Sequence, residues 1–149
     1  MASKSLTIEQ TYFVRASPTK VFRALTDPKW LTRWFLAKAS ITPEPGTSYT
    51  FHWQGGYKHT ARVLEAIPRH RLTLEWPNRV GRVTKVTRAT FELSKKGTGT
   101  LLRLRHSGYP AARPWLETYG ETQSGWAYFL TNLKSVLEYD RDLRSRYDS

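Results

Sequence analysis

The most constraining feature of this sequence is an amphipathic stretch near its C-terminal end, residues 125–137. Its apolar residues recur at intervals of three and four, which is the period of one apolar face on an α-helix. Asn132, Lys134 and Ser135 are expected on the opposite, polar face. The apolar face consists of Trp126, Phe129, Leu130, Leu133, Val136 and Leu137. A helix of this kind needs an apolar partner, so the rest of the chain must supply a surface that covers it.

The middle of the chain alternates between apolar and polar side chains, the period of half-buried strands. Clusters rich in Gly, Pro, Asn and Lys interrupt this alternation and predict turns. The predicted strands are 39–43, 47–54, 57–67, 70–76, 82–94 and 99–107, with Pro77-Asn78 taken as one of the turns. Because the connections are short, the strands are expected to be antiparallel neighbours.

The N-terminal part adds one more strand and two short helices. Residues 6–15 are rich in β-branched and aromatic residues and predict a strand. Ser17-Pro18 and Asp27-Pro28 each combine a helix-capping residue with a proline suited to the first helical turn. We therefore predict an α+β fold, with a seven-stranded antiparallel sheet, two short helices and one long C-terminal helix.

Length and composition further restrict the kind of protein that this chain can be. A chain of 149 residues is expected to form a single domain spanning residues 1–149. The absence of cysteine excludes a disulfide scaffold, a thiolate metal site and a thiol nucleophile. No apolar run is long enough for a membrane span and no apolar signal core precedes the first strand, so a cytoplasmic location is expected. The net charge of +12 favours polyanions, acidic partners or anionic membranes, unless it reflects a generally basic host composition.

Several short motifs, taken in their order, resemble the START-like (SRPBCC, birch-pollen-allergen-like) superfamily. Within it, the chain is most similar to homologues of the C-terminal domain of the activator of heat-shock protein 90 ATPase. The similarity extends over about residues 8–139. The motifs are residues 16–22 and 25–28, Trp34-Phe35, Pro45-Gly46, residues 72–76, Gly99-Thr100, residues 106–108, Gly125-Trp126, Leu130 and Leu133.

This resemblance implies a helix-grip fold, in which a curved sheet wraps around the C-terminal helix. In the superfamily, the space between them is commonly a cavity for apolar or aromatic small molecules. Members include lipid carriers, polyketide cyclases and aromatases, and chaperone co-regulators, so the fold alone does not define the function. Eukaryotic co-regulators carry a further N-terminal domain that grips the chaperone, and a chain of 149 residues is expected to lack it.

The histidines are the first candidates for polar contacts. A three-residue loop at Gln54-Gly55-Gly56 pairs Phe51 with His59 and keeps the charges outside, so we predict that His59 points inward and His52 outward. His106 is in phase with Leu102 and Leu104 and is also expected to point inward. Each inward histidine is either a polar ligand contact or acid/base group, or a histidine hydrogen-bonded at the rim of the cavity.

The sequence shows no clear pattern of catalytic or metal-binding residues. Two histidines are too few for a stable zinc site, and no Ser–His–Asp or paired-carboxylate arrangement can be recognised. Glu65 is the one carboxylate that a bulge in its strand would turn inward. The glycines at 55–56 are flanked by strands and do not form a phosphate-binding loop. We therefore assign no catalytic residue, metal or cofactor, and the residues favour a binding protein over an enzyme.

The tryptophans point most directly to a function. Trp34, Trp53, Trp76 and Trp126 all map to the space between sheet and helix, where aromatic walls with few polar groups are typical of a site for an apolar or aromatic ligand. The same side chains also suit a filled core, and Gly125 beside Trp126 suggests close helix-to-sheet contact. The predicted ligand-binding residues are Trp34, Phe51, Trp53, His59, Trp76, His106, Trp126 and Phe129.

We therefore predict a carrier or sensor for a small apolar or aromatic molecule. One alternative is a co-chaperone-like regulator whose partner is a heat-shock ATPase, and another is an enzyme of the polyketide cyclase or aromatase type. The outward arginines lack interleaved aromatic residues, so dedicated nucleic-acid binding is not expected. The oligomeric state is left open between monomer and homodimer.

Overall fold

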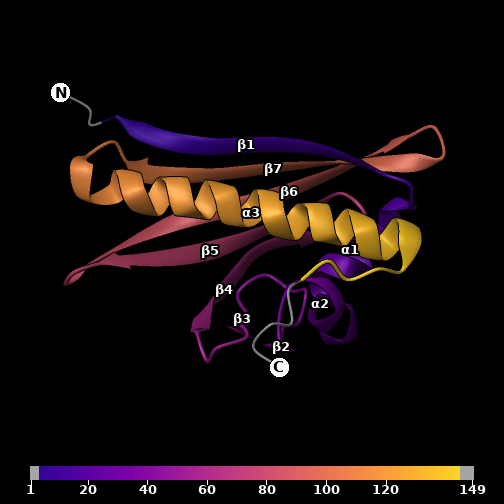
Figure 1. The fold of residues 1–149 in the computed structure, drawn as a ribbon, viewed down its shortest axis with the longest axis horizontal. Coiled ribbons are helices and arrows are strands. Elements are labelled where there is room, and N and C mark those ends of the chain that lie inside the picture. The colour runs from indigo at the N-terminus through magenta and orange to yellow at the C-terminus, as the bar shows by residue number, and fades with distance from the viewer. Residues whose placement is uncertain (1–3, 145–149) are drawn as a thin grey trace.

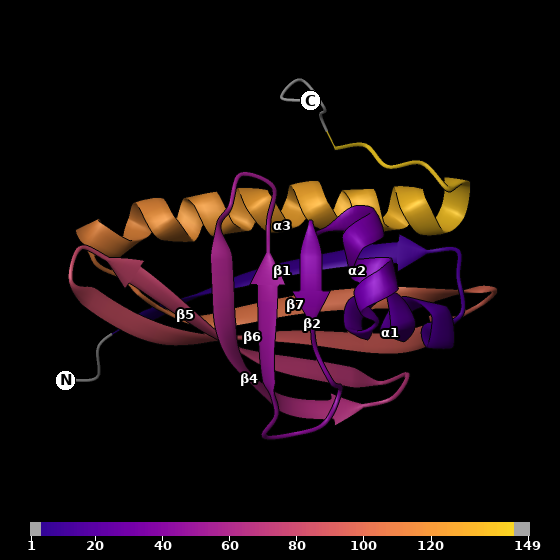
Figure 2. The same cartoon turned by 90° about the horizontal axis from the view of Figure 1, so that it is seen from below.

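The computed structural model describes residues 4–144. Its seven strands form one antiparallel sheet in the order β1-β7-β6-β5-β4-β3-β2, and the predicted α+β helix-grip fold is confirmed. Figure 1 shows α3 lying lengthwise along the sheet, with α1 and α2 near its C-terminal end, and Figure 2 shows how the sheet curves. The elements are β1 Ser5–Val14, α1 Pro18–Thr26, α2 Pro28–Trp34, β2 Lys38–Ser40, β3 Ser48–His52, β4 Lys58–Ile67, β5 Arg71–Val80, β6 Val83–Lys96, β7 Gly99–Pro110 and α3 Arg113–Tyr139.

The core is the contact between the concave face of the sheet and the apolar face of α3. Trp126, Leu130, Leu133 and Val136 are buried there, whereas Phe129 and Leu137 lie at the margin of the core. The sheet contributes alternate residues of its strands, as the period of two predicts. These include Tyr49, Phe51, Leu72, Leu74, Trp76, Ala89, Phe91, Leu93, Leu102 and Leu104.

One residue of α3 is placed differently from the prediction. Asn132 was expected on the polar face, but it is completely buried. After α3 the chain reverses at Asp140, which has a left-handed backbone, and the following residues cover Asn132. The Asn132 amide donates to the Trp34 carbonyl at 2.8 Å, and its oxygen accepts from the Leu143 N–H at 2.6 Å. Asn132 therefore ties α3 to α2, because a buried amide needs partners for both its oxygen and its nitrogen.

The long helix begins twelve residues earlier than the predicted stretch. Residues 113–124 are mostly polar, and Pro114 suggested a loop. The structure places this proline in the first turn of α3, where its missing N–H costs no hydrogen bond. In this half of the helix only Trp115 and Tyr119 are turned toward packed structure, while Thr118, Glu121 and Thr122 line an open cleft.

The hairpin between β5 and β6 is also longer than predicted. Pro77-Asn78 was taken as a turn, but both residues belong to β5, and the turn lies at Gly81-Arg82. The pairing of β4 with β5 ends at Val63 and Leu74, so β5 is an edge strand beyond that point. An edge strand tolerates proline because one side of it makes no ladder hydrogen bonds.

The outer face of the sheet is covered by exposed ion pairs. Arg62 pairs with Glu75 at 3.3 Å, and Arg71 lies 3.5 Å from Glu65 and 4.0 Å from Glu92. The bulge in β4 is present, with Leu64 as its extra residue, but it leaves Glu65 on the outer face. Much of the positive charge on this face is therefore neutralised locally, which weakens the case for a polyanion-binding sheet.

Candidate functional site: a cleft between the sheet and the long helix

A cleft of about 380 Å³ opens between the N-terminal half of α3 and the end of the sheet formed by the β5–β6 hairpin and the β3–β4 turn. Six aromatic side chains form its walls, and polar groups are grouped on β5 and α3. The volume is within the range typical of sites for small molecules. The lining residues are Phe35, Trp53, Tyr57, Trp76, Asn78, Arg79, Thr118, Glu121, Thr122, Gly125, Trp126 and Phe129.

One face of α3 supplies half of this lining. Thr118, Thr122, Gly125 and Phe129 are spaced by three or four residues and therefore lie above one another on the helix. Gly125 was expected to allow close helix-to-sheet contact. That expectation is wrong, because a Cβ built at Gly125 has no heavy atom within 4 Å. The glycine leaves room in the cleft.

The aromatic walls support one another through Phe35, the C-cap residue that follows α2. Its ring centroid lies 4.8 Å from Trp34, 5.3 Å from Trp53 and 4.9 Å from Phe129. Edge-to-face and stacked pairs at such distances stabilise beyond simple burial, by about 0.5–1.5 kcal/mol each. The walls are therefore a connected aromatic cluster rather than separate exposed rings.

Behind this cluster the space between sheet and helix is filled. Only about 10 Å³ of space remains among the residues that surround Trp34, Phe51, Leu74 and Phe91. Trp34 is held there by a hydrogen bond from its indole N–H to the Ala24 carbonyl at 2.8 Å. Filled core and open pocket are thus both present, at different depths of the same interface.

His106 lies behind Trp126 and connects α3 to the sheet. The Trp126 indole N–H donates to His106 Nδ1 at 3.0 Å, so the neutral ring carries its proton on Nε2. Nε2 then donates to the Thr87 hydroxyl oxygen at 2.6 Å, and that hydroxyl donates to the Trp76 carbonyl at 2.6 Å. Both ring nitrogens are engaged, and His106 links the Trp126 side chain, through Thr87, to the backbone of Trp76.

His59 is buried without such partners. Its pairing with Phe51 confirms the predicted register of the β3–β4 hairpin and its inward direction. The ring lies 4.3 Å from the Trp76 ring, but Nε2 has no hydrogen-bond partner among the residues that the structure describes. Leaving a buried polar atom unsatisfied costs about 1–3 kcal/mol. His59 therefore supports the back of the Trp76 wall at some cost in stability.

Burial of the two histidines makes the stability of the folded protein sensitive to acid. It lowers the pKa of His59 to about 4, and burial together with the nearby His59 lowers the pKa of His106 to about 3. The unfolded chain, with a histidine pKa of ~6.5, binds more protons below that pH, so the folded state is destabilised as pH falls. Between pH 7 and 5, each histidine should reduce the free energy of unfolding by roughly 2 kcal/mol.

Urea unfolding at pH 7, 6 and 5 checks this expectation. His59→Phe keeps a ring against Trp76 and removes the titrating nitrogen, so it should lose about half of the pH dependence. It should also stabilise the protein at pH 7, since no buried nitrogen is left without a partner. Equal pH dependence in the two proteins would contradict the assignment of His59 as a buried neutral group.

The eight predicted ligand-binding residues fall into three groups. Trp53, Trp76, Trp126 and Phe129 line the cleft, Trp34 and Phe51 belong to the filled region, and His59 and His106 support the walls from behind. Eight further residues that line the cleft were not among the predicted ones: Phe35, Tyr57, Asn78, Arg79, Thr118, Glu121, Thr122 and Gly125. Those on α3 extend the period of Trp126 and Phe129 toward the N-terminus, which was the available signal. Ligand binding by the eight predicted residues stays a prediction.

Two kinds of site are not found in the described part of the chain. Residues 4–144 contain no group of three or more His, Asp or Glu side chains placed to hold a metal ion. None of the helices within this range is both long enough and apolar enough to cross a membrane.

Comparisons with known proteins place this architecture in a family. Residues 15–138 match the profile described as Activator of Hsp90 ATPase homolog 1-like protein. No curated protein matches the chain. The fold resembles the solution structure of the Aha1 dimer from Colwellia psychrerythraea, with a TM-score of 0.80, 24% identity, and coverage of 91% of this chain and 98% of that chain.

Two further solved structures have the same fold. Protein MLL2253 from Mesorhizobium loti has a TM-score of 0.79 and 25% identity, covering 93% of this chain and 99% of that chain. CalU16 from Micromonospora echinospora has a TM-score of 0.68 and 28% identity, covering 95% of this chain and 78% of that chain. The fold family includes ligand-binding and polyketide cyclase-like members. With the family profile matching most of its length, the chain belongs to the Activator of Hsp90 ATPase homolog 1-like family, within the START-like superfamily.

Proposed function

We propose that this protein binds a small apolar or aromatic molecule in the cleft between α3 and the sheet, as a carrier or sensor. The observation that carries the proposal is an open cleft with aromatic walls directly in front of a filled core. Flat aromatic walls bury apolar area and hold rings in defined orientations. A rigid core behind them keeps the site preformed, which lowers the entropic cost of binding.

The polar groups suggest how the ligand is oriented. Asn78, Arg79 and Glu121 line the same cleft as the tryptophans. A few polar groups in an apolar site fix orientation and specificity. The proposed ligand therefore places its apolar rings against Trp53, Trp76 and Trp126 and carries at least one hydrogen-bonding group.

Tryptophan emission titrated with anilinonaphthalene sulfonate, naphthol and oleate tests the proposal. At least one of these should change the emission saturably with one binding site per chain, because three tryptophans line the cleft. Flat emission with all three compounds at concentrations up to about 1 mM, the weak end of specific binding, would reject the carrier or sensor function.

An enzymatic function of the cyclase or aromatase type has less support. Such an enzyme needs an ionisable group within hydrogen-bond reach of its substrate. Neither His59 nor His106 lines the cleft, and burial keeps both neutral at pH 7. The carboxylate that lines the cleft is Glu121, a solvent-exposed residue.

Regulation of a heat-shock ATPase is the second candidate, favoured by the family profile. This function requires a surface that contacts the chaperone, and it does not require the cleft. ATPase rates of the host's own heat-shock chaperone, measured with increasing amounts of this protein, test it. Unchanged rates at saturating protein would remove this candidate while leaving the ligand-binding proposal intact.

A further inference from the structure

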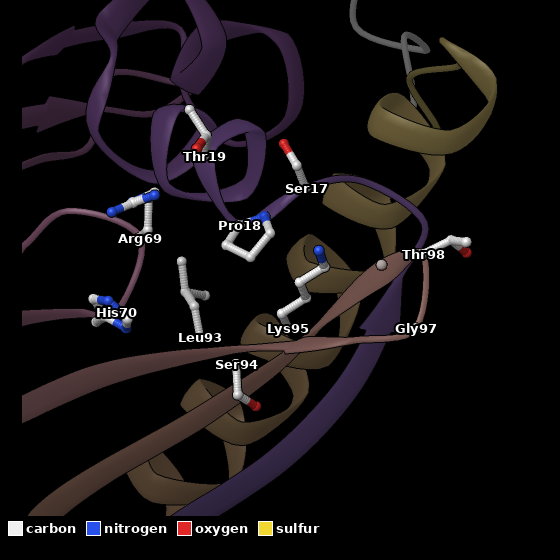
Figure 3. A pocket seen from close by; sticks show the side chains of 11 residues that line it. Ser17, Pro18, Thr19, Arg69, His70, Leu93, Ser94, Lys95, Gly97 and Thr98 are labelled. Carbon is white, nitrogen blue, oxygen red and sulfur yellow. The ribbon is translucent and has the colours of Figure 1, made fainter.

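A second concavity lies at the other end of β6, away from the ligand cleft. It has a volume of about 850 Å³ and is bounded by the first turn of α1, the turn between β4 and β5, and the β6–β7 turn. Figure 3 shows this groove, with Leu93 and Lys95 extending from β6 toward α1 and Arg69 on its other side near Thr19. The groove is built from three segments far apart in sequence, so the shape of the groove is determined by the tertiary fold.

The lining combines an apolar floor with cationic walls. Pro18, Leu93 and the glycines at 97 and 99 provide the floor, and Arg69 and Lys95 provide the charge. Lys95 follows Phe91 and Leu93 in the phase that faces the core, so its side chain rises from the concave face of the sheet. No aspartate or glutamate lines this groove.

Arg69 and Lys95 are unpaired, unlike three of the arginines on the outer face. Within residues 4–144, neither Arg69 nor Lys95 forms an ion pair or a side-chain hydrogen bond, whereas Arg62, Arg71 and Arg105 each pair with a glutamate. Arg69 also has a φ of 70°, a left-handed conformation that costs a non-glycine residue on the order of 1 kcal/mol. The strained turn places a cation at the groove without a local counter-charge.

We propose that this groove docks an acidic peptide segment of a partner protein, with one apolar side chain between carboxylates. Carboxylates complement Arg69 and Lys95, and an apolar side chain between them covers Pro18 and the small exposed edge of Leu93. Single-stranded nucleic acid fits less well, because proteins that bind it stack successive bases on several exposed aromatic rings, and His70 is the one ring among the residues that line this groove. The net charge of +12 further speeds the approach of an acidic partner.

Fluorescence anisotropy with a labelled peptide tests the docking site. The probe is a short peptide with one leucine flanked by glutamates. Arg69→Glu combined with Lys95→Glu should weaken its binding by about tenfold or more, as reversing two facing charges does. The matched control is Arg88→Glu combined with Arg103→Glu, which lowers the net charge equally on the outer face and should change binding less than about twofold.

Two further probes identify the occupant. Replacing the leucine of the peptide by serine should weaken binding about fivefold, because the apolar floor loses its contact. An oligouridylate of equal charge should bind more weakly than the peptide. The proposal is overturned if the native protein does not bind the peptide, if both double variants lose affinity equally, or if the oligouridylate binds tighter and loses affinity with Arg69→Glu.

Discussion

Gly125→Phe is expected to abolish ligand binding while leaving the fold intact. A Cβ at this position points into open space at the cleft, so a phenyl ring fills the volume that the ligand would occupy. Displacing roughly 110 Å² of apolar contact costs about 2.7 kcal/mol at ~25 cal/mol per Å². That loss corresponds to about a hundredfold in affinity for anilinonaphthalene sulfonate.

The same substitution should raise the free energy of unfolding slightly, although it lowers ligand affinity. Glycine within a helix is destabilising by roughly 0.5–1 kcal/mol relative to alanine, and phenylalanine recovers part of this difference. The control is Gly120→Phe, the same substitution on α3 at a position with free space that does not line the cleft. Binding unchanged in Gly125→Phe, or lost equally in Gly120→Phe, would show that the probe binds elsewhere.

Trp126→Ala is expected to have the largest effect on stability. The indole packs 5.2 Å from Trp76 and 5.4 Å from Phe91, and its N–H holds His106. Truncating a buried tryptophan costs about 3–5 kcal/mol. Leaving His106 Nδ1 without a donor adds the penalty of an unsatisfied buried atom, about 1–3 kcal/mol. Urea unfolding should show this loss, which approaches the whole stability of a small domain.

A double-mutant cycle separates packing from the hydrogen bond. Trp126→Phe keeps a ring and removes the N–H, His106→Phe removes the acceptor, and the double variant leaves neither group orphaned. The losses in free energy of unfolding of the two single variants should therefore add up to more than the loss of the double variant, with a coupling energy of about 1–3 kcal/mol. Additive effects would show that the contact between these two side chains does not stabilise the protein.

Alternation and helix-start signals predicted most of the fold. These local patterns work where one face of an element is buried, as in β6 and β7. They failed where an element faces an opening. The first half of α3 has few apolar residues because part of it lines the cleft, and Pro77 lies within β5 because the pairing of β4 with β5 has already ended.

The candidate site was predictable only as far as its apolar walls. Trp53, Trp76 and Trp126 follow from strand and helix phase alone. The curvature of the strands decides which aromatic rings line the cleft and which fill the core. The period of a strand shows which face a residue is on, but not how deeply it is buried. The helix period placed Asn132 on the polar face and the strand period placed His106 inward, but neither period shows that the hydrogen-bond partners of the two residues lie nearly a hundred and about twenty residues away. Such long-range partners are invisible to local patterns.

The most direct test of the central claim is an amide and indole NMR correlation spectrum with and without saturating anilinonaphthalene sulfonate. The chain has six tryptophans, of which Trp53, Trp76 and Trp126 line the cleft, while Trp30 and Trp115 do not. Binding in the cleft predicts large shifts of the three cleft indole signals, with the Trp30 and Trp115 signals unchanged. Shifts at Trp30 or Trp115 with the three cleft signals unmoved would contradict a ligand site between α3 and the sheet.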